Sequence, residues 1–132
     1  MGPAKELLNN LIGRWDLSGQ MGETPLQHSV VGRWTLGGTY MELYFQSNLP
    51  SQDDQPPYEA VYYIGYNQEN DLFVMHLLDT TAVGLSCTVG LGQQQDNEIP
   101  FQFTYETGPF TNRFIWEESA GTWKFEQTFL DN

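Results

Sequence analysis

The chain of 132 residues fits one domain with a substantial core and leaves little room for a second domain. Seventeen acidic residues against five basic ones give a formal net charge of −12, which repels the phosphates of nucleic acids and anionic membrane surfaces. We therefore expect an acidic protein whose partners include neither nucleic acid nor a membrane.

The single cysteine and the N-terminal residues bear on the compartment. Cys87 cannot form a disulfide within the chain, so the fold depends on packing, which suits a reducing compartment. The chain starts without a signal peptide, and no segment approaches the roughly 18 consecutive apolar residues of a membrane span. We expect a soluble cytoplasmic protein; a secreted or periplasmic protein with a trimmed leader is the alternative.

The first predicted element is a short amphipathic helix over residues 3–12. Pro3 suits its first turn and Gly13 suits its stop. One stripe of the helix is apolar and carries Leu7, Leu8, Leu11 and Ile12. A membrane anchor would need several basic residues, and only Lys5 is present, so we expect the stripe to plug one end of a barrel.

Nine segments that alternate polar with apolar side chains follow the helix, and Gly, Pro, Asn and Asp turns separate them. The segments are 13–21, 27–37, 39–49, 57–67, 70–79, 83–91, 98–106, 111–118 and 121–130. Most connections are shorter than the dozen residues that a parallel crossover takes. The pattern therefore predicts an all-β fold, a closed, antiparallel, up-and-down β-barrel of eight to ten strands over residues 13–130, with the helix at one end.

Residues two apart in a strand share a face, so parity divides the side chains between the lumen and the outside. The side that we assign to the lumen carries Trp15, Leu17, Met21, Val30, Trp34, Leu36, Met41, Leu43, Phe45, Phe73, Met75, Leu77, Leu85, Cys87, Val89, Phe101, Phe103, Tyr105, Phe114, Trp116, Trp123, Phe125 and Phe129. Segment 57–67 has aromatics on both faces, and segment 70–79 is apolar outside as well. An outward apolar surface must be covered, by the helix or by a second subunit, so a homodimer through 57–67 and 70–79 is one prediction.

No standard catalytic or phosphate-binding motif occurs in the sequence. His28 and His76 lie on different segments without metal-ligand spacing, so we expect structural histidines, no metal and no cofactor. Parity places Arg14, Arg33 and Arg113 opposite their neighbouring tryptophans and hence outside. The alternative is an inward Arg33 or Arg113 that holds a ligand carboxylate through two parallel hydrogen bonds.

The many large aromatics assigned to the lumen leave too little space for a long fatty acid. We predict a small pocket near an open end that binds a small neutral or cationic, hydrophobic or aromatic molecule. The residues that we assign to it are Trp34, Tyr62, Tyr105 and Trp116 as stacking walls and His28 as the polar group.

Two further hypotheses stay open. The first is a cofactor-independent lyase or isomerase, which needs an inward Glu42 or Glu59 beside Tyr44, Tyr63 and Arg33. The second is a homodimeric interaction module that has no ligand.

Several short motifs carry a resemblance to known barrels. Gly13-Arg-Trp15, directly after a short helix, resembles the Gly-x-Trp start of lipocalins and other calycins. Trp34-Thr-Leu-Gly-Gly38, Ile64-Gly-Tyr-Asn67, and Asp79-Thr80 followed by Gly84 resemble landmarks of a bacterial family of calycin-like barrels known only as a domain of unknown function. The match spans residues 7–90, and beyond it only Gly108 and Arg113 match.

The resemblance implies a lipocalin-like barrel with a lumenal site and no established activity. Two departures matter. Lys124 stands where lipocalins carry an arginine on the last strand. Haem-binding relatives place a histidine in the later strands, and this chain has none after His76, which argues against haem.

Overall fold

The computed structural model describes residues 3–21, 24–49, 57–80, 88–105 and 108–129. These residues form one short helix and a single antiparallel sheet of nine strands in chain order, β1 to β9. The elements are α1 (Pro3–Asn9), β1 (Gly13–Met21), β2 (Thr24–Thr35), the 3-10 turn η1 (Leu36–Gly38), β3 (Tyr40–Ser47), β4 (Glu59–Asn67), β5 (Leu72–Asp79), β6 (Gly90–Gly92), β7 (Glu98–Tyr105), β8 (Gly108–Glu117) and β9 (Thr122–Phe129).

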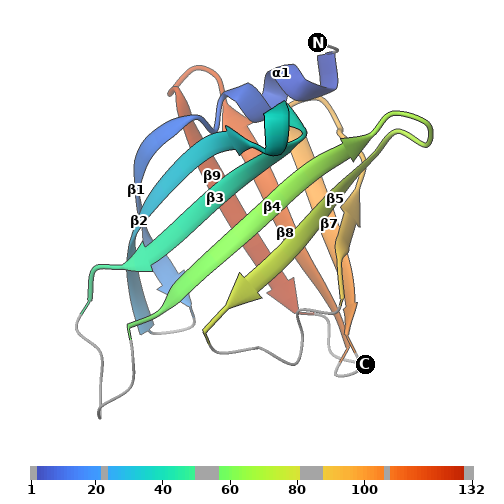
Figure 1. Cartoon of the computed structure of the whole chain (residues 1–132). Helices are drawn as coiled ribbons and strands as arrows, with labels where there is room; N and C mark the ends of the chain where they lie inside the picture. The colour runs from blue at the N-terminus through green and yellow to red at the C-terminus, as the bar shows by residue number, and fades with distance from the viewer. Residues whose placement is uncertain (1–2, 22–23, 50–56, 81–87, 106–107, 130–132) are drawn as a thin grey trace.

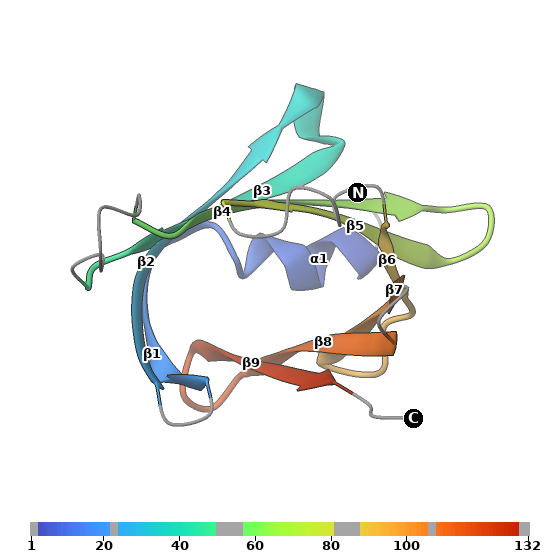
Figure 2. The same cartoon turned by 90° about the horizontal axis from the view of Figure 1, so that it is seen from below.

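The sheet curls through 289° into a half-barrel, hereafter the open barrel, and α1 lies across one end of it (Figures 1 and 2). Each strand pairs with the next along the chain, which confirms the all-β up-and-down meander. The sheet order ends at β1 on one side and β9 on the other, so the described residues show no backbone pairing that would close the barrel. The prediction of full closure is therefore wrong for the described chain. We call the opening between β1 and β9 the seam.

Two element ends differ from the predicted ones. Segment 27–37 ends as a strand at Thr35, and Leu36, assigned to the lumen, lies in η1 with 69% of its surface exposed. The cause is local, because Leu36 and Gly37 both have positive φ angles, 51° and 69°, that no strand accommodates. The helix ends at Asn9, and Ile12 is half-exposed instead of sharing the buried stripe. In segment 83–91, Leu85 and Cys87 lie outside the described residues.

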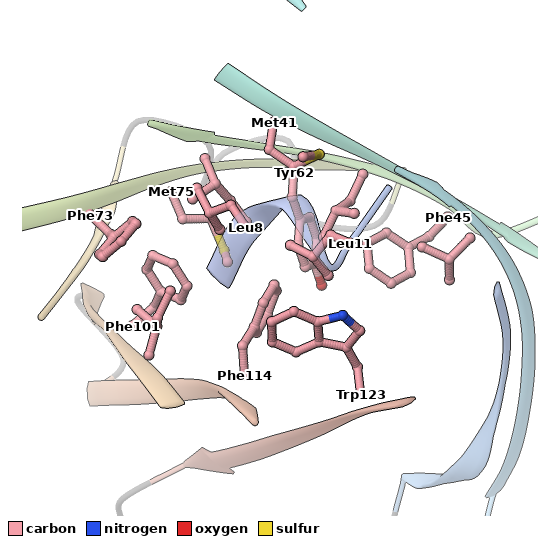
Figure 3. Close-up of a cluster of buried hydrophobic side chains, with 14 of the residues drawn as sticks. Leu8, Leu11, Met41, Phe45, Tyr62, Phe73, Met75, Phe101, Phe114 and Trp123 are labelled. Atoms are coloured by element: carbon pink, nitrogen blue, oxygen red, sulfur yellow. The ribbon is translucent and has the colours of Figure 1, made fainter. Parts of the chain in front are cut away.

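The lumen is filled by the apolar faces of the strands, as parity predicts (Figure 3). Its buried side chains include Met41, Leu43, Phe45, Tyr62, Ile64, Phe73, Met75, Phe101, Phe103, Phe114 and Trp123. Leu7, Leu8 and Leu11 add the buried stripe of the helical segment. These side chains form one apolar core that reaches the helical segment, which confirms that the helix plugs this end.

Three indoles and one ammonium group fix the helical segment to the sheet. Trp15 Nε1 donates to the carbonyl of Leu11 at 3.0 Å, and Trp123 Nε1 donates to the carbonyl of Asn10 at 2.9 Å. From the other side, Trp34 Nε1 donates to the side chain of Asn9 at 2.7 Å, and Lys5 Nζ donates to Gly38 O at 3.0 Å. The helical segment also packs closely against Gly32, where a Cβ would lie 1.9 Å from the Leu11 carbonyl oxygen. The chain after α1 thus packs directly on the backbone of β2.

The arginines lie outside the open barrel, as parity predicts. Arg33 pairs with Glu42 at 2.8 Å, and 66% of its side-chain surface is exposed. Arg113 is also exposed and lies 3.5 Å from Glu98 and 3.7 Å from Glu126. The alternative in which Arg33 or Arg113 holds a ligand carboxylate in the lumen is therefore wrong.

Candidate functional site

The five residues assigned to a ligand site do not come together. Trp34 and Trp116 lie at the end that α1 covers: Trp34 bonds to Asn9, and the ring of Trp116 contacts those of two other tryptophans, the nearer at a centroid distance of 5.2 Å. His28, Tyr62 and Tyr105 lie toward the opposite end. The structure thus places two of the five residues at the end of the open barrel that α1 covers, which we call the plug, and the other three in a separate region of the lumen.

Polar side chains gather at the end of the open barrel away from α1, which we call the distal end. The residues that form this distal cluster are His28, Tyr58, Tyr62, Asp79, Tyr105 and Asn112. They come from β2, the residue before β4, β4, β5, β7 and β8. Each has the inward parity of its strand. These polar groups therefore lie among the buried apolar side chains of the lumen.

His28 is buried, with 8% of its surface exposed. Its ring stacks on Tyr58 at a centroid distance of 5.4 Å and meets Phe45 edge-on at 6.4 Å. Among the described residues its Nδ1 has no hydrogen-bond partner. Burial lowers the pKa of His28 below 6.5, so at neutral pH the ring is uncharged and offers either a donor or an acceptor.

Three tyrosines surround one carboxylate in the distal cluster. The Tyr58 hydroxyl donates to Asp79 Oδ2 at 3.0 Å. Burial raises the pKa of Tyr58, and the neighbouring Tyr62 and Asp79 raise it further. Burial likewise raises the pKa of Tyr62 and of Tyr105, with Asp79 adding to both rises. The phenols therefore stay protonated and act as hydrogen-bond donors near a carboxylate.

Asn112 is the most deeply buried polar side chain of the distal cluster, with 1% of its surface exposed. The amides of Asn112 and Gln127 lie near the Tyr62 hydroxyl and oppose the burial-driven rise of its pKa. Even so, neither Nδ2 nor Oδ1 of Asn112 has a partner at hydrogen-bond geometry among the described residues. One donor group and one acceptor group therefore lie side by side, unpaired, inside the protein.

Sequence reasoning did not assign Tyr58, Asp79 or Asn112 to the site. Parity was a sufficient signal for all three. Tyr58 lies two residues before the buried Ala60, Asp79 two residues after Leu77, and Asn112 two residues before Phe114. They were missed because the inward face was read from its apolar members alone.

Two hollows lie along β1. The larger, about 240 Å³, is lined by Asp16, Leu17, Ser18, Gln27, His28 and Asn48. The smaller, about 30 Å³, lies at the seam between β1 and β9 and is lined by Leu11, Trp15, Asp16, Leu17, Val30, Thr122, Trp123 and Phe125. The larger hollow touches the distal cluster at His28 and is below the roughly 300–1,000 Å³ of drug-sized pockets, so only a small molecule fits.

The acid–base arrangement that a lyase or isomerase requires is not formed. Glu42 accepts from Tyr63 at 3.1 Å and pairs with the exposed Arg33, while Glu59 accepts from Tyr44 at 2.6 Å on the outer face. Hydrogen bonding from Arg33 lowers the pKa of Glu42, which is the opposite of what a general base tuned toward neutral pH needs. Both glutamates point outward, so this hypothesis is wrong as stated.

Within the described ranges, no three His, Cys, Asp or Glu residues are grouped so that they could hold a metal ion. In the same ranges no helix is long and apolar enough to cross a bilayer. Comparison of the chain with protein-family models, curated proteins and solved structures found no match. The nine-stranded antiparallel curled sheet is consistent with a calycin-like fold.

Proposed function

We propose that this protein is a member of the bacterial calycin-like family and that it binds a small, neutral or cationic aromatic molecule at the distal cluster. The observation that carries the proposal is the buried, unpaired amide of Asn112. A buried polar group without a partner costs about 1–3 kcal/mol, so it persists where it has a use. A ligand that presents an acceptor next to a donor would satisfy both amide atoms.

The surrounding rings favour an aromatic ligand. Tyr62 packs on Phe45 at a centroid distance of 4.5 Å, and His28 stacks on Tyr58 close by. Such faces bind a flat ring in stacked or edge-on geometry. The nearby hollow of about 240 Å³ limits the ligand to about one ring with a short polar substituent.

Charge favours a neutral or cationic ligand over an anion. The formal charge of the chain is −12, and Asp79 lies within the distal cluster beside Tyr58. An anionic group brought next to this carboxylate would be repelled in a partly dry environment. Three probes of similar size separate the cases: benzamide is neutral, benzamidine is a cation and benzoate is an anion.

The experiment measures thermal unfolding of the wild-type chain with each probe at millimolar concentration. We expect benzamide and benzamidine to raise Tm and benzoate to leave it unchanged, because a ligand that binds only the folded state stabilises it. Asn112→Leu should abolish the response, and Asn70→Leu, in the exposed β4–β5 turn, should retain it. The proposal fails if no probe raises Tm, or if Asn112→Leu responds as the wild type does.

A homodimer through the outer faces of β4 and β5 is the second candidate function. Leu78 is 46% exposed and lies opposite Val61 in the register, and Leu91 is 43% exposed and lies opposite Val74. Exposed apolar side chains on adjacent strands are typical of an interface. Sedimentation should give twice the chain mass for the wild type and the single mass for Leu78→Lys; a monomeric wild type would exclude this dimer.

A further inference from the structure

We propose that the seam between β1 and β9 binds an extended basic segment of another protein, which adds to the sheet as a tenth strand. The proposal is independent of the distal cluster and its ligand. It starts from strand direction. Nine strands that alternate in direction leave β1 and β9 running the same way, both away from α1 (Figure 1).

This common direction prevents the sheet from closing on itself as a purely antiparallel barrel. Direct pairing of β9 with β1 would be a parallel ladder, which is slightly less stable per residue than an antiparallel one. A single inserted strand that runs toward α1 would instead be antiparallel to both edges. It would complete a barrel of ten strands without a free edge.

The width of the seam fits one strand. The sheet curls through 289°, so its eight steps between neighbouring strands take about 36° each. The remaining about 71° corresponds to about two such steps, and two steps hold one additional strand. By this angular measure the gap matches the spacing that one additional strand needs.

The side chains along the seam match the inner side of a strand. The smaller hollow lies between the two edges of the seam. It shares Asp16 and Leu17 with the larger hollow, whose other lining residues belong to β1, to β2 and to the residue after β3. Leu17 and Trp15 line the seam from β1, and Trp123 and Phe125 line it from β9. Every second residue of an added strand would face these apolar groups.

The negative charge of the protein favours a basic segment. The formal charge is −12, and Asp16, which lines both hollows, is exposed on β1. Basic residues on the outward positions of the segment would be attracted by this field. A second copy of the chain would instead bring more negative charge to the seam. The fitting partner is thus an extended segment that alternates apolar with basic residues.

The test uses a synthetic peptide of the length of β9, 8 residues, that alternates valine with lysine. Two control peptides have the same length: one has the valines and lysines in two blocks, and the other alternates valine with glutamate. Amide hydrogen exchange of the wild-type chain is the readout. We expect every second amide of β1 and of β9 to exchange freely without peptide and to become protected with the alternating basic peptide alone.

Two charge variants distinguish attraction of the peptide to Asp16 from its attraction to the overall negative charge of the protein. Asp16→Lys and Glu69→Lys make the same change in net charge, but Glu69 lies in the β4–β5 turn, far from the seam in the sheet order. We expect Asp16→Lys to weaken peptide binding about tenfold and Glu69→Lys to weaken it by about twofold or less.

Four results would overturn the proposal: protection of both seam edges in the free chain, equal binding of the block-ordered peptide, equal effects of the two lysine variants, or no binding. Protection of one edge that depends on protein concentration would show that a second copy occupies the seam, which also contradicts it. The exchange measurement uses the wild-type chain, so it still tests the proposal if Asp16→Lys does not fold.

Discussion

Asn112→Leu tests whether the buried amide is really unpaired. The side chain is 1% exposed, and its two polar atoms lack partners among the described residues. Leucine has a similar size and no polar atom, so it removes the desolvation cost while keeping most of the packing. We expect the free energy of unfolding to rise by about 1–3 kcal/mol. For a domain of this length the corresponding rise in Tm is about 3–10 °C.

The assay is urea unfolding followed by tryptophan fluorescence, because all four tryptophans lie in or near the plug and report global unfolding. Asn70→Leu is the matched control: its site is exposed, and its effect should stay within about 0.5 kcal/mol. A loss of 1 kcal/mol or so in Asn112→Leu would refute the reasoning, since it would mean that the amide is hydrogen-bonded in the native protein.

Three more changes test the plug and the distal cluster. Trp123→Phe removes a partly buried hydrogen bond to the chain after α1, so it should destabilise by about 1–3 kcal/mol in urea unfolding. Trp116→Phe, whose indole bonds an exposed carboxylate, should cost less. Gly32→Ala would put a Cβ 1.9 Å from the backbone carbonyl oxygen of Leu11. We expect the free energy of unfolding to fall by at least about 2 kcal/mol and the α1 amides to exchange faster. Amide exchange of α1 at the wild-type rate would contradict this packing. The pKa of His28 is below 6.5 in the folded state, so the unfolded chain binds the proton first and stability falls as pH drops below 6.5. His28→Gln should reduce this loss between about pH 7 and pH 5, and a pH profile identical to that of the wild type would contradict the assignment.

Alternation along the chain determined most of the sheet. Phe101 and Phe103 are buried, and Arg33 and Arg113 are outside. A strand has only two faces, and the position of a residue along the strand determines the face on which its side chain lies. The short turns determined the pairing, since neighbouring strands with brief connections can only pair antiparallel. Leu36 was misassigned because its positive φ depends on the whole η1 turn and leaves no trace in the alternation.

The alternation of polar and apolar residues does not determine how far along the barrel axis each side chain lies, or how far the whole sheet curls. Trp34 and Trp116 share the inward face with His28 and Tyr62, yet they lie at opposite ends, because the depth of each side chain depends on the register and tilt of all nine strands. Asn112 meets Tyr62 only because β8 lies across the lumen from β4. The curl of 289°, and with it the seam, is the sum of the small twists between neighbouring strands. Such a sum is decided by packing around the whole lumen, so only the tertiary structure reveals it.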